Sequence, residues 1–172
     1  IPKPDYNLNV GSGGHGYQTG NILIGIEDIL INEKPDLVLV YGDTNSTLAG
    51  ALAAVKLHIK VGHVEAGLRS FDKTMPEEIN RVLVDHCSDL LFCPSQTEVN
   101  FLGNEHVSSG VYLTGDVMVD TLMSNKANIE KAGVLNDLSL VNKDYIVATI
   151  HRPINTDSKE NRKHARKNKN KI

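Results

Sequence analysis

The sequence predicts an α/β fold built on a doubly wound parallel sheet with helices on both faces. Short β-rich runs alternate with longer segments of helical apolar spacing, as in strand–helix–strand units. Two of the runs, LVLV and YIVATI, are continuous apolar stretches, which parallel strands covered on both faces require. With 40% hydrophobic residues, the 172-residue chain can bury a core.

Six short β-rich runs are predicted strands. They are Tyr6–Val10, Leu37–Tyr41, Ile59–Val64, Leu90–Cys93, Val111–Leu113 and Tyr145–Ile150. Two of the segments between them are predicted helices. In Ile22–Ile31 the apolar residues recur at helical steps, and Leu48–Leu57 is rich in Ala and Leu, which are good helix formers. This order of elements predicts right-handed crossovers within one sheet.

The composition changes after residue 132. The segment 133–143 lacks periodicity and is rich in Gly, Asn and Asp, so it is a predicted linker. It separates a first domain, residues 1–132, from the start of a second, residues 144–172. The second domain begins with the strand YIVATI, but the helix expected from Ser158 has no apolar face and could not dock on a sheet.

The charge is unevenly spread along the chain. The net charge of −3 combines a basic tail, residues 159–172, with a body that carries 11 bases against 20 acids. So acidic a body argues against a nucleic-acid partner, and the tail is interpreted as a solvated terminus. No apolar run is long enough to span a bilayer, so no membrane partner is expected. The two cysteines, Cys87 and Cys93, are too few for a disulfide framework and favour a reduced, cytoplasmic setting.

Candidate binding residues follow the strands, because ligands of open α/β sheets bind beyond the carboxyl ends of the strands. After the strand LVLVY, Gly42 allows a turn, and Asp43 with Thr44 precedes a helix. Two interpretations stay open for this segment. It is either a plain helix N-cap, or a ligand site formed by an acid, several hydroxyls and free backbone amides.

The segment VGHVEAGLRS places Glu65 just after a strand and close to Arg69. The carboxylate is either neutralised by Arg69 in a structural pair or held for proton transfer. In the helix that begins with PEEINR, acids in the first turn complement the helix dipole, and Glu77 could pair with Arg81 four residues on. Spacing alone does not separate the structural from the catalytic interpretation.

The glycine cluster GSGGHG, which contains His15, fits the spacing G-x-G-x-x-G. A dinucleotide site needs an acid about 20 residues on, at the end of the next strand. Asp36 has that spacing but begins the strand, and Asp43 follows the strand but is too far, so a flexible turn is the better interpretation. The histidines and cysteines show no metal-ligand spacing, and neither a metal nor any other cofactor is predicted. His151 stands apart because it follows the predicted strand YIVATI and precedes Arg152.

Five motifs, GDTNST, HVEAGLRS, PEEINR, GDVMVD and HR followed by Asn155, occur in the order found in the non-hydrolysing UDP-N-acetylglucosamine 2-epimerases. The chain resembles that family from about residue 4 to residue 161. The resemblance implies one Rossmann-like lobe, lacking its first strand, of a two-lobed GT-B-like homodimeric enzyme. It also implies a UDP-sugar substrate, with UDP-GlcNAc and UDP-ManNAc interconverted by elimination and re-addition of UDP, without a metal or a redox cofactor.

Carried over residue by residue, the resemblance implies that Asp43, Glu65 and Glu77 are the carboxylates of proton transfer. It places His151 near the leaving diphosphate. The predicted substrate contacts are Arg69, Arg81, Arg152, His15 and Thr44.

The chain departs from the family at two places. Where the family reads HR-x-E-N, Ile154 replaces the glutamate, and most of the second lobe would lie beyond residue 172. We therefore expect an incomplete, inactive portion of an epimerase. The alternatives are a hydrolysing relative that releases ManNAc, a two-lobed glycosyltransferase and a non-catalytic remnant.

Overall fold

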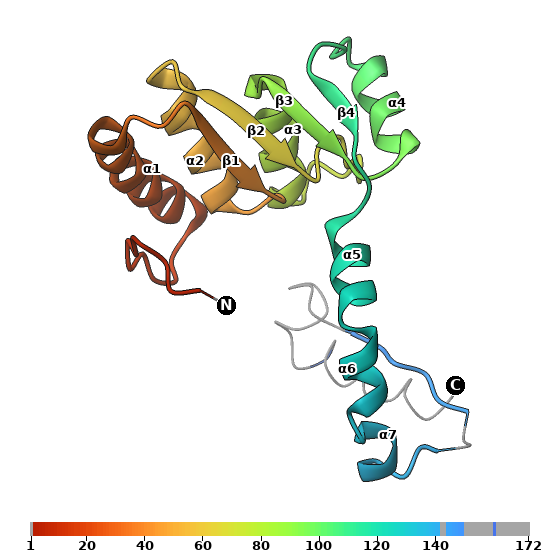
Figure 1. The fold of residues 1–172 in the computed structure, drawn as a ribbon. Helices are drawn as coiled ribbons and strands as arrows, with labels where there is room; N and C mark the ends of the chain where they lie inside the picture. The colour runs from red at the N-terminus through yellow and green to blue at the C-terminus, as the bar shows by residue number, and fades with distance from the viewer. Residues whose placement is uncertain (1, 142–143, 150–159, 161–172) are drawn as a thin grey trace. The chain divides into compact units, whose positions relative to one another are not determined.

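A computed structural model describes residues 2–141, 144–149 and 160 (Figure 1). The chain divides into two compact units, Ile1–Ser124 and Asn125–Ile172. The predicted domain limits at residues 132 and 143 fall inside the second unit and stay a prediction.

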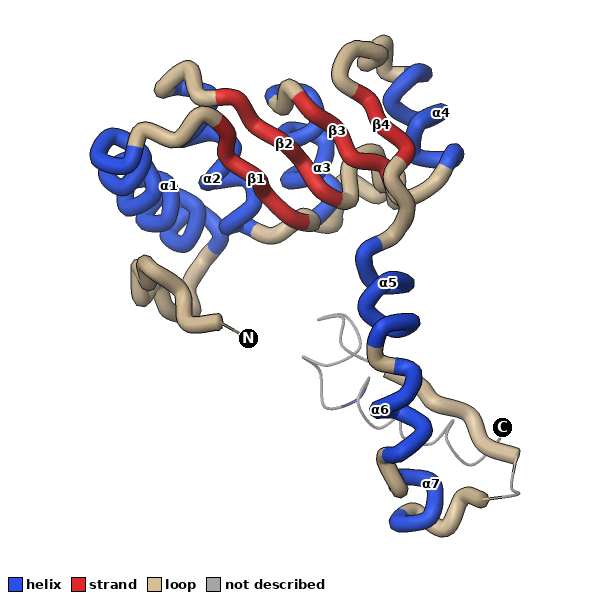
Figure 2. Tube along the Cα trace, viewed as in Figure 1, coloured by secondary structure: helices blue, strands red, loops and turns tan. Residues whose placement is uncertain are grey.

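The first unit is built on a parallel sheet in the order β1-β2-β3-β4. The strands are β1 (Leu37–Tyr41), β2 (Lys60–Val64), β3 (Leu90–Cys93) and β4 (Val111–Leu113). Figure 2 shows them side by side, and the register pairs Val40 with His63 and Phe92 with Tyr112. The parallel α/β sheet and these four strands confirm the sequence prediction.

Helices alternate with the strands along the chain. In the described part of the first unit they are α1 (His15–Glu33), α2 (Asn45–Lys56), α3 (Pro76–Cys87), α4 (Gln96–Asn104) and α5 (Val117–Ser124). The second unit contains α6 (Lys126–Lys131) and α7 (Val134–Asp137). The helices predicted over 22–31 and 48–57 correspond to α1 and α2. None of the described helices is long and apolar enough to cross a membrane.

The residues of β1 show how the described helices cover the sheet. Val38 and Val40 face the apolar side of α2 and belong to the core. Leu37, Leu39 and Tyr41, which alternate with them, are 38%, 47% and 61% exposed. The helical layer expected on the second face of a doubly wound sheet is not among the described residues.

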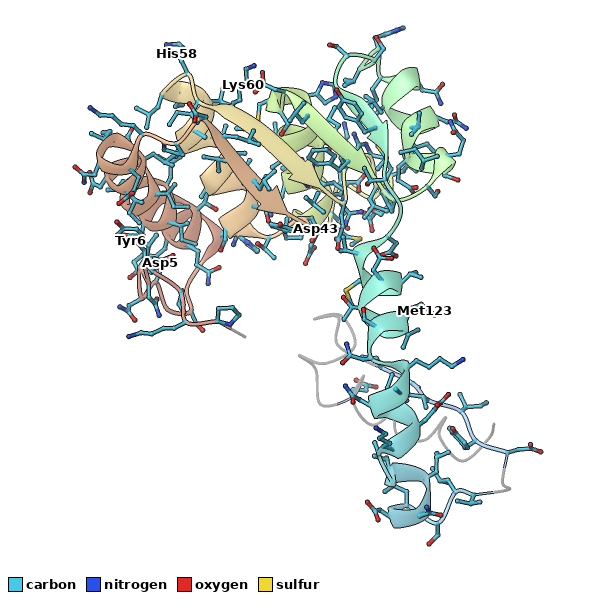
Figure 3. All side chains as sticks on the ribbon, viewed as in Figure 1. Asp5, Tyr6, Asp43, His58, Lys60 and Met123 are labelled. Carbon is cyan, nitrogen blue, oxygen red and sulfur yellow. The ribbon has the colours of Figure 1, made fainter. Side chains whose placement is uncertain are left out.

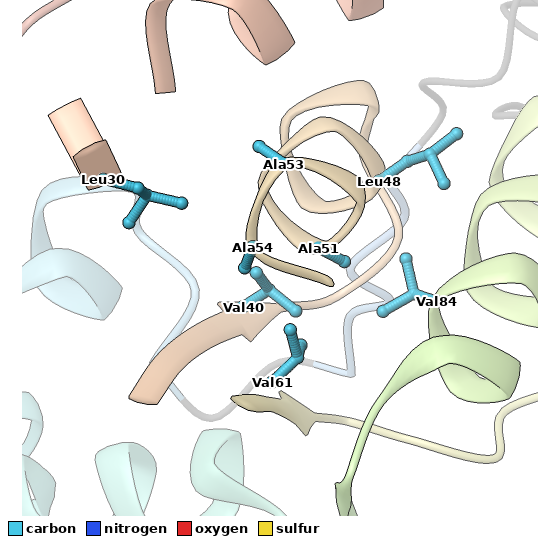
Figure 4. Packing of buried hydrophobic residues seen from close by; sticks show 8 residues of the cluster. All are labelled: Leu30, Val40, Leu48, Ala51, Ala53, Ala54, Val61 and Val84. Atoms are coloured by element: carbon cyan, nitrogen blue, oxygen red, sulfur yellow. The ribbon is translucent and has the colours of Figure 1, made fainter. Parts of the chain in front are cut away.

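The main core lies between α2 and the sheet, with α1 and α3 at its sides (Figure 4). Its buried members are Leu30, Val40, Leu48, Ala51, Ala53, Ala54, Val61 and Val84. Small side chains bring α2 close to β1, since even a Cβ added to Gly50 would stand 3.4 Å from the Val40 side chain. This close packing holds the first turn of α2 at the carboxyl end of β1, where Asp43 lies.

Two predicted strands are not strands in the structure. Residues 6–10 pair with no strand among the described residues, and Asn9 has a φ of 51°, which is not an extended conformation. Leu8 lies against Gly25 of α1, where an added Cβ would be 2.7 Å from the leucine. Residues 144–149 also form no strand. A β-rich run becomes a strand only when a neighbour pairs with its backbone, and the described residues supply no such neighbour.

Candidate active site

The loops that follow β1 and β2 lie together at the carboxyl edge of the sheet, with Asp43 at the end to which the β1 arrow points (Figure 3). The Gly42 N–H donates to the Val64 carbonyl over 3.1 Å, so the loops are joined directly. Gly42 has a φ of 67°, which glycine adopts without strain. A carboxylate oxygen of Glu65 lies 3.6 Å from the point where a Cβ on Gly42 would stand, so Glu65 packs against the Asp43 loop.

Two residues of α3 hold the Asp43 loop from the other side. The Arg81 guanidinium forms an ion pair with the Asp43 carboxylate, and Asn80 Nδ2 donates to the Asp43 carbonyl over 2.9 Å. Arg81 also lies 3.3 Å from Glu78, so it pairs with these two acids and not with Glu77. The pair that helical spacing allowed between Glu77 and Arg81 does not form, because tertiary packing brings Asp43 within reach.

Thr44 is the N-cap of α2. Its hydroxyl accepts from the Thr47 N–H, and the Thr47 hydroxyl accepts from the Thr44 N–H over 3.1 Å, which is a capping box. The Thr47 hydroxyl also donates to the Tyr41 carbonyl over 2.6 Å. The capping interpretation is therefore confirmed, and the substrate contact of Thr44 stays a prediction.

The two glutamates at the start of α3 differ sharply. Glu77 is exposed, and no described residue hydrogen-bonds to its carboxylate or pairs with it. Glu78 is only 3% exposed and accepts from the backbone N–H groups of Ser70 and Phe71 over 2.8 and 2.9 Å. Burial alone would raise the pKa of Glu78, but these hydrogen bonds, the Ser70 hydroxyl and Arg81 outweigh it and lower the pKa. Glu78 therefore anchors the loop after GLR, while Glu77 is free to meet a ligand.

His15 lies at the start of α1, close to the start of α2. Its Nδ1 is 3.1 Å from the side-chain nitrogen of Asn45, which also donates to Gln18 over 2.9 Å. Asn80 reaches the Asn45 side-chain oxygen over 3.4 Å. Asn45 thus links His15 to the helix that holds Asp43, a role that sequence reasoning missed because no local pattern marks it.

A buried charge cluster lies beneath the Glu65 loop. Arg69, with a side chain only 1% exposed, donates to Asp85 over 2.6 Å and forms a bidentate pair with Glu105 over 2.7 and 2.8 Å. Asp85 also lies 2.7 Å from His63. Arg69 therefore neutralises Asp85 and Glu105, and the structural pair with Glu65 that the sequence allowed does not form.

Hydrogen bonds shift the pKa of two members of this cluster, Glu105 and Arg69. The bond from Arg69 and the one from His86 lower the pKa of Glu105 to about 2, against the effect of burial. Burial would lower the pKa of Arg69, but its bonds to Glu105 and Asp85 raise it. Arg69 is thus a fixed cation beneath the loop, and its substrate contact stays a prediction.

Sequence reasoning missed His63, Asp85, Glu78 and Asn80, which support the site from below. The signal available was the polar residues within otherwise apolar elements: HVE in a buried strand, and Asp in the last turns of PEEINRVLVDHC. His151, Arg152 and Ile154 lie outside the described residues.

A groove of about 460 Å³ lies on the outer side of α3. Its lining includes Phe71, Ile79 and Leu83, whereas Asp43 and Glu65 are not part of it. The groove is lined in part by Arg69 and Phe71 of the loop that carries Glu65, but the two carboxylates themselves do not line it. In the part of the chain that the structure describes, no group of His, Cys, Asp and Glu side chains could hold a metal ion.

Comparisons with known proteins identify relatives of the chain. A family model described as UDP-N-acetylglucosamine 2-epimerase matches residues 1–171. A "UDP-N-acetylglucosamine 2-epimerase homolog" of Methanococcus maripaludis is 61% identical over 94% of this chain and 46% of its own length. A "UDP-2,3-diacetamido-2,3-dideoxy-D-glucuronate 2-epimerase" of Pseudomonas aeruginosa is 50% identical over 91% of the chain and 44% of its own.

A solved structure shows the same fold. The crystal structure of the Methanocaldococcus jannaschii UDP-GlcNAc 2-epimerase, in complex with UDP-GlcNAc and UDP, has a TM-score of 0.87 and 50% sequence identity. The similarity covers 97% of this chain and 47% of that one. The chain thus spans about half the length of the relatives it matches, and it has the fold of part of a GT-B-like epimerase. Because the family model matches residues 1–171 and a solved member matches the chain with a TM-score of 0.87, the chain belongs to the UDP-N-acetylglucosamine 2-epimerase family.

Proposed function

We propose that the whole protein to which this chain contributes interconverts UDP-GlcNAc and UDP-ManNAc as a non-hydrolysing 2-epimerase. The observation that carries the proposal is the pair of loops after β1 and β2, joined by the bond from Gly42 to Val64, which bring Asp43 and Glu65 to one edge of the sheet. The names of the relatives supply the substrate class.

The chemistry needs acid–base groups on two faces of the sugar. One carboxylate takes the proton from C2 while the bond between C1 and the UDP oxygen breaks, which leaves a C1–C2 double bond. UDP then adds back at C1, and an acid delivers a proton to the opposite face of C2. Asp43, Glu65 and Glu77 are the proposed acid–base groups.

The departing diphosphate needs positive charge. We assign this to His151 and Arg152, with further substrate contacts from His15, Thr44 and Arg81. Arg81 also orients Asp43 through their ion pair. No metal or redox cofactor takes part in the proposed steps.

The test uses a chimaera in which residues 1–132 replace the matching stretch of a full-length relative. Incubated with UDP-GlcNAc in deuterated water, it should form UDP-ManNAc with deuterium at C2, observed by proton NMR. Free ManNAc with UDP would instead establish a hydrolysing enzyme. Turnover that requires an added sugar acceptor would establish a glycosyltransferase, and no turnover at all would support a non-catalytic remnant.

The same assay should include a diacetamido-glucuronate nucleotide, because a 50% identical relative is named for that substrate. Preference for it would change the proposed sugar without changing the proposed chemistry.

Two further parts of the proposal concern the setting of the protein. We propose a homodimer, which sedimentation of the chimaera tests directly. We also propose a cytoplasmic location, supported by the two free cysteines, Cys87 and Cys93.

A further inference from the structure

We propose that Asp85 is a positioning residue whose single buried carboxylate fixes the position of the Asp43 loop relative to the Glu65 loop. The proposal rests on the proposed function in that it takes these two acids as catalytic groups. Asp85 itself lies in the last turns of α3, is 1% exposed and faces none of the solvent at the site.

One arm of the arrangement runs to the Asp43 loop through His63. Asp85 Oδ1 lies 2.7 Å from His63 Nδ1, and His63 Nε2 lies 2.7 Å from the Gly42 carbonyl. A carbonyl only accepts hydrogen bonds, and so does an ionised carboxylate, so both ring nitrogens face acceptors. Both bonds form together only if the ring carries both protons. We therefore assign His63 as a fully buried imidazolium paired with Asp85.

The other arm runs to the Glu65 loop. Asp85 Oδ2 accepts from the Gly67 N–H over 3.0 Å and from Arg69 over 2.6 Å. The turn is unusual because Glu65 and Gly67 have φ values of 70° and 80°. A Cβ on Gly67 would stand 2.7 Å from the Glu98 carbonyl oxygen, so only glycine fits. A backbone with left-handed φ values persists when contacts from other parts of the fold hold it. Asp85 supplies two such contacts, to the Gly67 N–H and to the Arg69 side chain.

The charged and titratable side chains around the pair are Arg69, Glu105 and His86. Asp85 bonds to His63 through one oxygen and to Arg69 through the other. Arg69 is in turn balanced by Glu105, which also meets His86. Asp85 Oδ2 accepts from both Arg69 and Gly67, so the carboxylate that His63 faces is already held in place by two N–H donors.

The position of the two arms gives Asp85 its effect. His63 bonds to the residue before Asp43, and Gly67 is two residues after Glu65. A shift of either loop moves one acid relative to the sugar carbon that both must address. Misplacement of about 1 Å can cost about 10²-fold in rate without any loss of the reacting groups.

The test is Asp85→Asn in the chimaera, with Asp89→Asn as the matched control. Asparagine keeps the shape but replaces one acceptor oxygen with a donor, so it cannot serve His63, Gly67 and Arg69 together. Asp89 also accepts from a backbone N–H, that of Val61 over 2.9 Å, but at the opposite end of β2. We expect Asp85→Asn to lower kcat by about 10²-fold with KM changed less than about 3-fold. Asp89→Asn should leave both within about 2-fold.

A spectroscopic measurement separates positioning from mere stability. In the 15N-labelled 172-residue chain at pH 7, both ring nitrogens of His63 should carry protons, and in Asp85→Asn at least one should lose its proton. A neutral His63 in the unsubstituted chain would overturn the arm to Gly42, even if Asp85→Asn did not fold. A kcat for Asp85→Asn within about 2-fold of the unsubstituted chimaera would overturn the proposal as a whole. If the unsubstituted chimaera forms no product, the proposed function fails, and the ring-nitrogen spectrum still decides whether Asp85 holds His63.

Discussion

Replacing Glu78 with glutamine is expected to lower the free energy of unfolding by about 2 kcal/mol, while the same change at Glu77 leaves it within about 0.5 kcal/mol. Glu78 is 3% exposed and accepts from two backbone N–H groups, the Ser70 hydroxyl and Arg81. Glutamine has one acceptor oxygen and turns an amide donor toward the remaining donors.

The magnitude follows from the number and setting of these bonds. A hydrogen bond to a charged group contributes about 1.5–3 kcal/mol. The N–H donors of Ser70 and Phe71 belong to an exposed loop, so water can hydrogen-bond to them when the carboxylate is lost. The expected loss in the free energy of unfolding is therefore near the lower end of the range for one such bond, at about 2 kcal/mol. In a chain of this length, about 2 kcal/mol lowers Tm by about 4–8 °C.

Thermal unfolding of the 172-residue chain at pH 7, followed by circular dichroism, measures the first effect. The same two substitutions in the chimaera measure turnover, where Glu77→Gln should lose about 10²-fold or more as a lost acid–base group does. These results would show that Glu78 contributes to the stability of the fold, whereas its neighbour Glu77 contributes to the rate of the reaction. The reasoning is refuted if Glu78→Gln keeps its Tm and loses turnover, because Glu78 would then be the group that meets the sugar.

Four further outcomes are expected. In the chimaera, Asp43→Asn and Glu65→Gln should each reduce turnover about 10²-fold or more; normal turnover with a lower Tm would make Glu65 a structural residue. Folding lowers the pKa of Glu78, and lowers that of Glu105 to about 2, from the ordinary value of 4.5. The ionised carboxylates therefore stabilise the folded state by an amount that is fully present above pH 4.5. This stability should be lost as pH falls from there toward about 2, and a Tm-against-pH profile of Glu105→Gln should be flatter in that range. Turnover should be unaffected by EDTA, and activity restored only by a divalent ion would contradict the metal-free mechanism. The 172-residue chain alone should show no epimerisation and bind UDP more weakly than about 1 mM by calorimetry, because we propose that the uridine and much of the diphosphate are held by the other lobe. Tighter binding would place the nucleotide in this lobe.

Local sequence patterns were enough to predict the strands of the sheet and the start of α2. The runs 37–41, 90–93 and 111–113 are strands at the predicted residues, and β2 begins one residue later than predicted. Thr44 caps α2 as its position before an Ala-rich segment suggested. These features depend on backbone preferences and on apolar periodicity, and both are determined by residues that are close together in the sequence.

The partners of the charged residues were decided only by tertiary structure. The sequence allowed Glu65 to pair with Arg69 and Glu77 with Arg81, yet Arg69 binds Asp85 and Glu105, and Arg81 binds Asp43. It also predicted a strand at 6–10, which pairs with nothing described. In each case the outcome depends on which distant segment packs alongside, and a buried charge takes the partner that the fold brings within hydrogen-bonding distance, whatever its separation along the chain.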